Sequence, residues 1–216
     1  MKKNITIPNY SLSEELINAV SHGIGAVLSV VALVLCVISA SRHHSAKAII
    51  ACSLYGSMSI ILYTVSTLYH ALKAGKAKRI LRILDHCSIY LLIVGTYTPY
   101  CLIALPAPLG LIIWCINLSC GILGVILNAI NMYKYRVVSM ILYIIMGWMI
   151  IFSFKSLVSS IEKGGVVLML IAGGLYTIGA LFYIIGKKIK YIHSVFHFFV
   201  LGASIFFFFS IYLYVI

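Results

Sequence analysis

The sequence predicts an all-α integral membrane protein, a bundle of seven transmembrane helices, and two observations carry this prediction. Of the 216 residues, 63% are hydrophobic and only 9% are charged, whereas soluble domains carry about 25% charged residues. A soluble fold of this size could not bury so much apolar surface, so lipid must solvate the chain. The apolar residues also form long runs without strict alternation, which favours helices over a β-barrel.

Short connections separate the apolar runs and leave no stretch for a water-soluble domain. Each run is close to the roughly 20 residues that a helix needs to cross about 30 Å of hydrocarbon. We therefore predict one domain over residues 1–216, located in the cell membrane as a multi-pass protein. The predicted spans are 22–41, 48–72, 83–104, 109–130, 137–158, 166–186 and 191–215.

Residues 1–21 are predicted to form a cytoplasmic segment that contains a short helix. Ser11 and Glu14 match the capping box S-x-x-E, which predicts a helix start at this point. This helix either leads into the first span or lies along the membrane surface. The first apolar run exceeds the 7–15 residues of a signal peptide core, so it should remain as a membrane helix. In the third span, Pro99 predicts a kink.

The distribution of Lys and Arg predicts the orientation. One side of the membrane receives twelve of them, namely Lys2, Lys3, Lys73, Lys76, Lys78, Arg79, Arg82, Lys134, Arg136, Lys187, Lys188 and Lys190, and the other receives Arg42, Lys47, Lys155 and Lys163. The positive-inside rule then places the N-terminus in the cytoplasm and the C-terminus outside. The net charge of +12 is interpreted as this topological signal plus an attraction to anionic lipid headgroups. Nucleic acid is not an expected partner.

Ionisable side chains gather at one end of the predicted bundle. The second span ends near His70, the third meets Asp85 and His86 early, and the seventh meets His193 and His197 in its first two turns. All of these positions lie on the cytoplasmic side, about 5–10 Å below the interface at 1.5 Å per residue. Ionisable residues inside membrane helices are costly and need an explanation.

The spacing of three histidines favours a metal site. His193 and His197 form H-x-x-x-H, so both imidazoles share one helix face and can reach one ion. Such a pair alone is more often a hydrogen-bonded packing pair, but His70 could supply a third nitrogen at the same depth. Three histidines with an open fourth position are typical of a catalytic zinc, whose water has a pKa near 7 and yields a nucleophile. We therefore predict one zinc ion as the cofactor.

Asp85 and Ser66 are the predicted catalytic side chains. Asp85 could hydrogen-bond the water or orient a ligand histidine. Ser66 lies four residues before His70, so it faces the same way, and its hydroxyl could polarise a carbonyl or hold the water. His86 adjoins Asp85 and points about 100° away from it, so we expect only one of the two to face the site and favour Asp85.

Four further side chains could surround the ligands. Glu15, Asn18 and His22 lie on one helical face, and His86 follows Asp85. For His22 the sequence leaves two alternatives open: a contact with the site, or an interfacial position.

At these residues the chain resembles the hemolysin III family, within the progestin and adipoQ receptor (PAQR) superfamily. The matching motifs span nearly the whole chain and are Glu15-x-x-Asn18-x-x-x-His22-Gly23, Ser66-x-x-x-His70, Asp85-His86, Gly95-Thr96-Tyr97-Thr98-Pro99 and His193-x-x-x-His197. The resemblance implies a seven-helix bundle with zinc near the cytoplasmic face, held by the three histidines, with Asp85 and Ser66 close to the bound water. It also implies a relation to membrane hydrolases such as alkaline ceramidases, and hence hydrolysis of a lipid amide.

Several functions remain open at this stage. The first is a zinc-dependent intramembrane hydrolase acting on an amide or ester of a membrane lipid. The second is a non-enzymatic, receptor-like regulator of membrane state, with lipid as ligand and zinc as a structural brace. A cytolysin, which the name hemolysin suggests, is disfavoured because the chain has no secretory signal and too little polar surface for a soluble state. A transporter is disfavoured because the charged groups cluster at one face and seven spans do not divide into equal halves.

Overall fold

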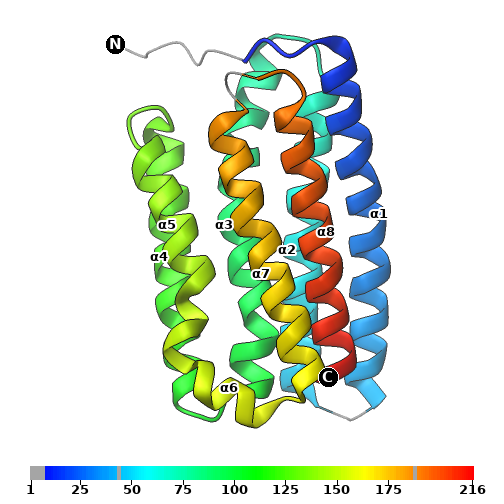
Figure 1. Cartoon of the computed structure of the whole chain (residues 1–216), viewed down its shortest axis with the longest axis vertical. Coiled ribbons are helices and arrows are strands. Elements are labelled where there is room, and N and C mark those ends of the chain that lie inside the picture. The colour runs from blue at the N-terminus through cyan, green and yellow to red at the C-terminus, as the bar shows by residue number, and fades with distance from the viewer. Residues whose placement is uncertain (1–7, 43–44, 187–188) are drawn as a thin grey trace.

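The computed structural model describes residues 8–42, 45–186 and 189–216. Residues 1–7 of the predicted N-terminal segment, and Lys187 and Lys188 of the orientation count, lie outside the described residues. The described part holds seven helices long and apolar enough to cross a membrane, so the prediction of an all-α, seven-helix membrane bundle is confirmed. The start of the first helix and the C-terminus lie at opposite ends of the bundle (Figure 1).

The first helix, α1 (Leu12–Arg42), begins well before the predicted span at residue 22. The predicted capping box forms at its start: the Ser11 hydroxyl and backbone N–H both donate to Glu14 Oε2, at 2.7 and 2.9 Å. The short N-terminal helix and the first span are therefore one continuous helix. The sequence left open whether this helix leads into the first span or lies along the membrane surface, and the structure shows that it leads into the span.

Two further spans contain changes of helix type. Helix α3 (Lys76–Pro99) continues into a π-helical turn, η1 (Tyr100–Ala104), directly after Pro99. Proline lacks an N–H and crowds the preceding turn, so it is a common point of irregularity in a helix. The fifth span, predicted as one helix over 137–158, is α5 (Arg136–Trp148), a 3₁₀ segment η2 (Met149–Ser153) and α6 (Phe154–Ser160).

The remaining spans are single helices. These are α2 (Ala46–Ala71), α4 (Leu109–Asn131), α7 (Lys163–Ile185) and α8 (Ile192–Tyr214).

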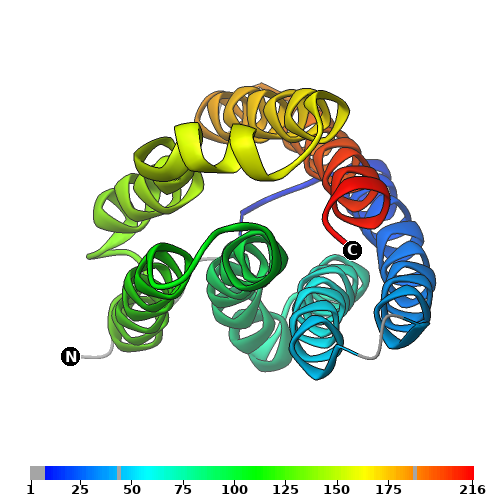
Figure 2. The same cartoon turned by 90° about the horizontal axis from the view of Figure 1, so that it is seen from below.

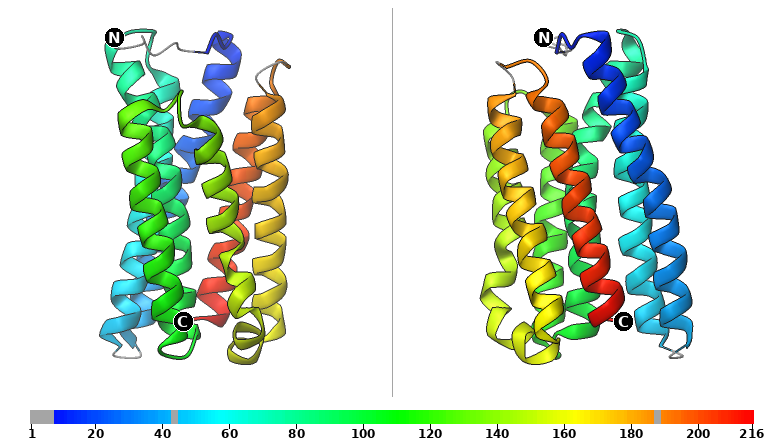
Figure 3. Two further views of the ribbon diagram at one scale, coloured as in Figure 1. Left: turned by 90° about the vertical axis from the view of Figure 1, so that its left-hand side faces the viewer. Right: turned by 45° about the vertical axis from the view of Figure 1, so that its right-hand side comes forward.

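The helices are arranged as a ring of neighbours, with α3 the most enclosed (Figure 2). Helix α1 packs against α2 and α8, α2 packs against α3, and α7 packs against α8 (Figure 3). Outward-facing apolar side chains such as Val27, Val31 and Val34 are exposed, whereas polar pairs lie inside, as where the Tyr100 hydroxyl donates to Ser210 at 2.7 Å. Apolar outside and polar inside is the pattern expected of a bundle solvated by lipid.

Candidate metal centre

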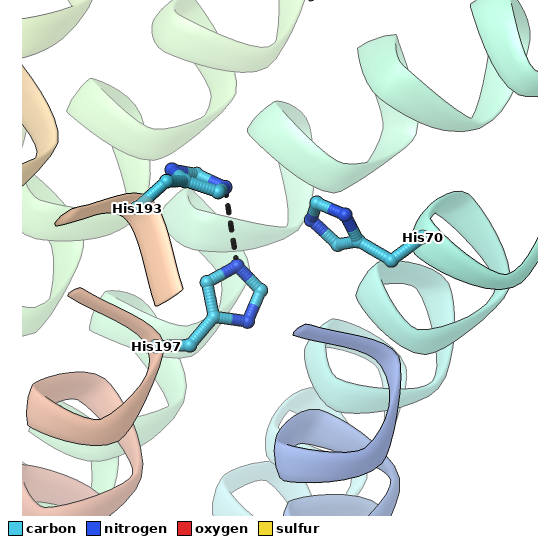
Figure 4. Close-up of side chains that lie close together, drawn as sticks. All are labelled: His70, His193 and His197. Carbon is cyan, nitrogen blue, oxygen red and sulfur yellow. Dashed lines mark hydrogen bonds between the residues drawn. The ribbon is translucent and has the colours of Figure 1, made fainter. Parts of the chain in front are cut away.

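Three buried histidines converge between α2 and α8, at the end of the bundle where α1 begins. His70 lies in the last turn of α2, and His193 and His197 lie in the first two turns of α8. One ring nitrogen from each lies within 4.8 Å of the others, and the Nε2 atoms of His193 and His197 are 3.2 Å apart. Figure 4 shows the three rings facing one another.

These three nitrogens could hold a metal ion, and the spacing of one pair is close to that in a zinc site. Tetrahedral zinc with Zn–N bonds of 2.0–2.1 Å holds its nitrogens about 3.3 Å apart, which is close to the His193–His197 separation. Among the described residues, His70 Nε2 is buried without a hydrogen-bond partner. A buried unpaired polar atom costs about 1–3 kcal/mol, and a bound cation would remove that cost at a ligand nitrogen. Around a tetrahedral ion the histidines would supply three ligands and leave a fourth position for water or substrate.

Glu15 orients His70 from the opposite side of the ring. Its Oε2 lies 2.7 Å from His70 Nδ1, and its Oε1 accepts a 2.6 Å bond from Lys78 Nζ. Lys78 is buried, at 3% exposure, and also donates to the Leu72 carbonyl at 2.9 Å. A carboxylate bonded to one imidazole nitrogen leaves the other nitrogen free to bind metal and fixes the ring in place.

Asn18 and His22 complete the packing around the histidines. The Asn18 amide nitrogen is 3.5 Å from His70 Nδ1. The His22 ring stacks on His197 with centroids 3.7 Å apart and meets Tyr63 edge-on at 5.0 Å. His22 is 3% exposed, so of the two alternatives from the sequence it contacts the site. It is not part of the three-histidine group.

Ser66 and Asp85 both line the cavity beside the histidines. Asp85 lies within interaction range of the Ser66 hydroxyl and of His70. His86 lines the same cavity, with its ring 6.0 Å from the Tyr183 ring. The expectation that only one of Asp85 and His86 faces the three histidines stays a prediction. The His86 backbone carbonyl accepts a 2.8 Å bond from the Tyr143 hydroxyl.

The cavity has a volume of about 1120 Å³, slightly above the roughly 300–1,000 Å³ of ordinary ligand pockets. It begins at Tyr10 and Arg82, passes His193 and His197 and reaches Met169 and Phe207 toward the other end of the bundle. From His197 to Phe207 along α8 is about 15 Å. Its deep part is lined mainly by apolar and aromatic side chains, so it offers room for an extended apolar chain.

Tyr10 is a site residue that the sequence analysis missed. Its ring stacks on His193 with centroids 4.9 Å apart and an interplanar angle of 12°, and it lies 5.9 Å from the His70 ring. Burial raises the pKa of the Tyr10 hydroxyl, so it stays neutral. A tether holds this segment in place, because the Tyr191 backbone N–H donates to Glu14 Oε1 at 2.8 Å. No sequence motif marks Tyr10, since its role depends on a contact with the distant helix α8.

Comparison with known proteins points to one family. The sequence model described as "Haemolysin-III related" matches residues 10–208. "Hemolysin-3" of Bacillus cereus is 40% identical over 216 residues, covering 100% of this chain and 98% of the relative. "Hemolysin-3 homolog" of Bacillus subtilis is 38% identical and covers 95% of this chain and 96% of the relative. The human "Monocyte to macrophage differentiation factor" is 29% identical over 74% of this chain and 68% of its own length. No solved structure matches the chain.

Proposed function

Because the chain belongs to the haemolysin-III-related family and is a seven-span membrane protein, we propose that it is a zinc-dependent hydrolase of a membrane-lipid amide or ester. The observation that carries the proposal is the convergence of three buried imidazoles, two of which, His193 and His197, line a long cavity that is also lined by Ser66 and Asp85. A structural zinc needs the ligands but neither the cavity nor the two extra side chains.

The proposed roles follow from the chemistry of each side chain. His70, His193 and His197 would hold the ion, and Glu15 keeps His70 in position. Zinc in such a site supplies a Lewis acid that polarises a carbonyl and lowers the pKa of water. Asp85 would accept the proton of the attacking water and pass it to the leaving group. The Ser66 hydroxyl would donate a hydrogen bond to the carbonyl oxygen as negative charge develops there.

The cavity supplies the remaining requirements of lipid hydrolysis. Its deep, apolar part would hold an acyl chain, so that the carbonyl at the head of the chain lies at the level of the histidines. Under the predicted orientation this level is about 5–10 Å below the cytoplasmic interface, where the carbonyl groups of bilayer lipids are found. The Tyr10 ring covers His193 on the side of the cavity mouth and would limit the access of bulk water.

The test is the release of fatty acid by purified protein in mixed micelles that contain lipid esters and lipid amides, followed by mass spectrometry and paired with elemental analysis. We expect His193→Ala to lose both zinc and turnover, and Asp85→Asn to keep zinc but lose turnover by at least about 100-fold. Glu162→Gln is the matched control, because it also removes a carboxylate but at an exposed position at the start of α7. It should behave as wild type. Turnover by metal-free His193→Ala, or no release from any ester or amide by zinc-loaded wild type, would refute the proposal.

A further inference from the structure

We propose that the mouth of the cavity binds the phosphate of an anionic membrane lipid, which makes an anionic glycerophospholipid the class of lipid that enters the site. The assignment of this lipid as substrate rests on the proposed function. The binding itself does not depend on turnover and can be tested alone.

Three basic side chains from three separate segments line the mouth. Arg82 comes from α3, Arg136 from the start of α5, and Lys190 from the connection before α8. Tyr183 in α7 lies within electrostatic range of both arginines, so the two cations surround one opening although they are distant in sequence. The Arg82 guanidinium also donates to the Tyr133 hydroxyl and lies over that ring.

The acidic residues of the chain cannot neutralise this opening. There are only four of them, and Glu162 lies at the opposite end of the bundle, at the start of α7. Glu14 is bonded to the Tyr191 N–H and to Ser11, and Glu15 is bonded to Lys78 and His70. Asp85 is then the carboxylate left to balance three cations, so the mouth carries a net positive charge.

This arrangement matches a phosphate more closely than it matches a general membrane surface. The planar guanidinium of arginine forms paired hydrogen bonds to phosphate oxygens, lysine adds a point charge, and tyrosine hydroxyls can donate as well. Attraction to anionic headgroups by basic residues around helix ends is diffuse. Here the basic groups open into a cavity whose deep part is apolar, so one ligand must carry an anion and an apolar chain together.

The position of the mouth relative to the histidines specifies the type of lipid. The Tyr183 ring lies 6.1 Å from the His193 ring, so the anion-binding mouth adjoins the metal centre. In a glycerophospholipid a few bonds of the glycerol backbone separate the phosphate from the acyl ester carbonyl. A phosphate at the mouth would therefore place an ester carbonyl at the histidines and the acyl chain in the apolar cavity. A choline headgroup would bring a further cation to an opening that is already positive.

The test is native mass spectrometry of the purified protein with equimolar phosphatidylglycerol and phosphatidylcholine of identical acyl chains, in chelator so that no lipid is consumed. We expect wild type to retain phosphatidylglycerol in preference, and Arg82→Gln to bind it about tenfold more weakly, the size of one charge-assisted hydrogen bond. Arg136→Gln tests the same site from another helix, should Arg82→Gln fail to fold. Arg79→Gln is the matched control, because Arg79 is exposed on the same helix and does not line the cavity.

A parallel arm separates a lipid headgroup from free phosphate. Inorganic phosphate at the same concentration as the lipid should leave bound phosphatidylglycerol in place, because it lacks the acyl chains. Displacement by inorganic phosphate, equal retention of the two lipids, or an equal loss of binding in Arg79→Gln would each overturn the inference. If lipid binding behaves as expected while no lipid is hydrolysed, the proposed function fails and the binding site stands.

Discussion

Replacement of Glu15 by glutamine should weaken both the fold and the metal site, for separable reasons. Glu15 is the charge partner of Lys78, at 2.6 Å, and Lys78 is 3% exposed. Removing one partner of a buried ion pair costs about 3–5 kcal/mol, because the other charge stays buried and unpaired. The Glu15 side chain is 16% exposed and Lys78 keeps the Leu72 carbonyl, so we expect a loss near the lower limit, about 3 kcal/mol.

The effect of Glu15→Gln on zinc comes through His70. The carboxylate contacts His70 Nδ1 at 2.7 Å, and loss of such a partner lowers metal affinity by about 10–100-fold. The amide oxygen of glutamine can still accept a hydrogen bond from Nδ1, so we expect a loss of about tenfold.

The double variant Glu15→Gln/Lys78→Met separates the two effects. It removes the buried cation together with its partner, so most of the lost stability should return. Zinc affinity should stay about tenfold below wild type, because His70 still lacks the carboxylate. Thermal unfolding in detergent with chelator measures the stability, and competition with a fluorescent chelator measures the affinity. If zinc affinity returned together with stability, Glu15 would act only on the fold, and the argument that it positions His70 would be wrong.

Two further predictions concern the packing that holds the bundle together. Gly110→Ala should destabilise the protein by at least about 2 kcal/mol, because the added Cβ would lie 2.0 Å from the Cys101 carbonyl oxygen. In the control variant Gly147→Ala the added Cβ meets nothing within 4 Å, so this change should be neutral or stabilising by up to about 1 kcal/mol. Equal melting temperatures for the two variants would contradict this prediction. Tyr97→Phe should lower the free energy of unfolding by about 1–3 kcal/mol. The reason is that the Tyr97 hydroxyl donates to the Gly147 carbonyl and accepts from the Ile150 N–H, each at 2.9 Å. A melting temperature equal to that of wild type would show that water or a local rearrangement replaces both bonds.

The number and type of the spans could be predicted because lipid contact requires apolar outer faces, and these leave long runs in the sequence. The helix ends and interruptions could not be predicted in the same way. The 3₁₀ segment Met149–Ser153 lies in an apolar run like any other. Its backbone groups are partly satisfied by Tyr97 from α3, a tertiary contact that no local pattern reveals. The capping box at Ser11 was visible, but only the structure shows that the helix continues into the span.

The cluster of three histidines could be predicted because the directions of the spans fix the depth of each residue. Alternating span directions bring the end of α2 and the start of α8 to the same end of the bundle, which placed His70, His193 and His197 together. Lys78 was counted only as one of many basic residues in a loop, yet it is buried against Glu15. Its role, like that of Tyr10, depends on side-chain contacts between segments far apart in sequence, and a single sequence carries no signal of these.

The protein is expected to lose stability on chelation whether the bound ion is catalytic, as in a hydrolase, or purely structural. His70 lies on α2, His193 and His197 lie on α8, and α1 packs between these helices. An ion bound by all three would link α2 to α8, and its removal would lower the melting temperature whatever its chemistry. A thermal shift with chelator therefore tests the ligand set alone.

Ser66 is the side chain that distinguishes the two hypotheses. It is buried beside the histidines and lines the cavity, but it is not one of the three ligands. Structural zinc sites usually have four protein ligands and no open coordination position. A zinc with a purely structural role would therefore not require a hydroxyl beside an open position. If the hydroxyl stabilises the developing oxyanion, Ser66→Ala should keep zinc and melting temperature while turnover falls about 100-fold. Full turnover by a zinc-loaded Ser66→Ala protein would remove Ser66 from the reaction and leave Asp85 as the only remaining candidate.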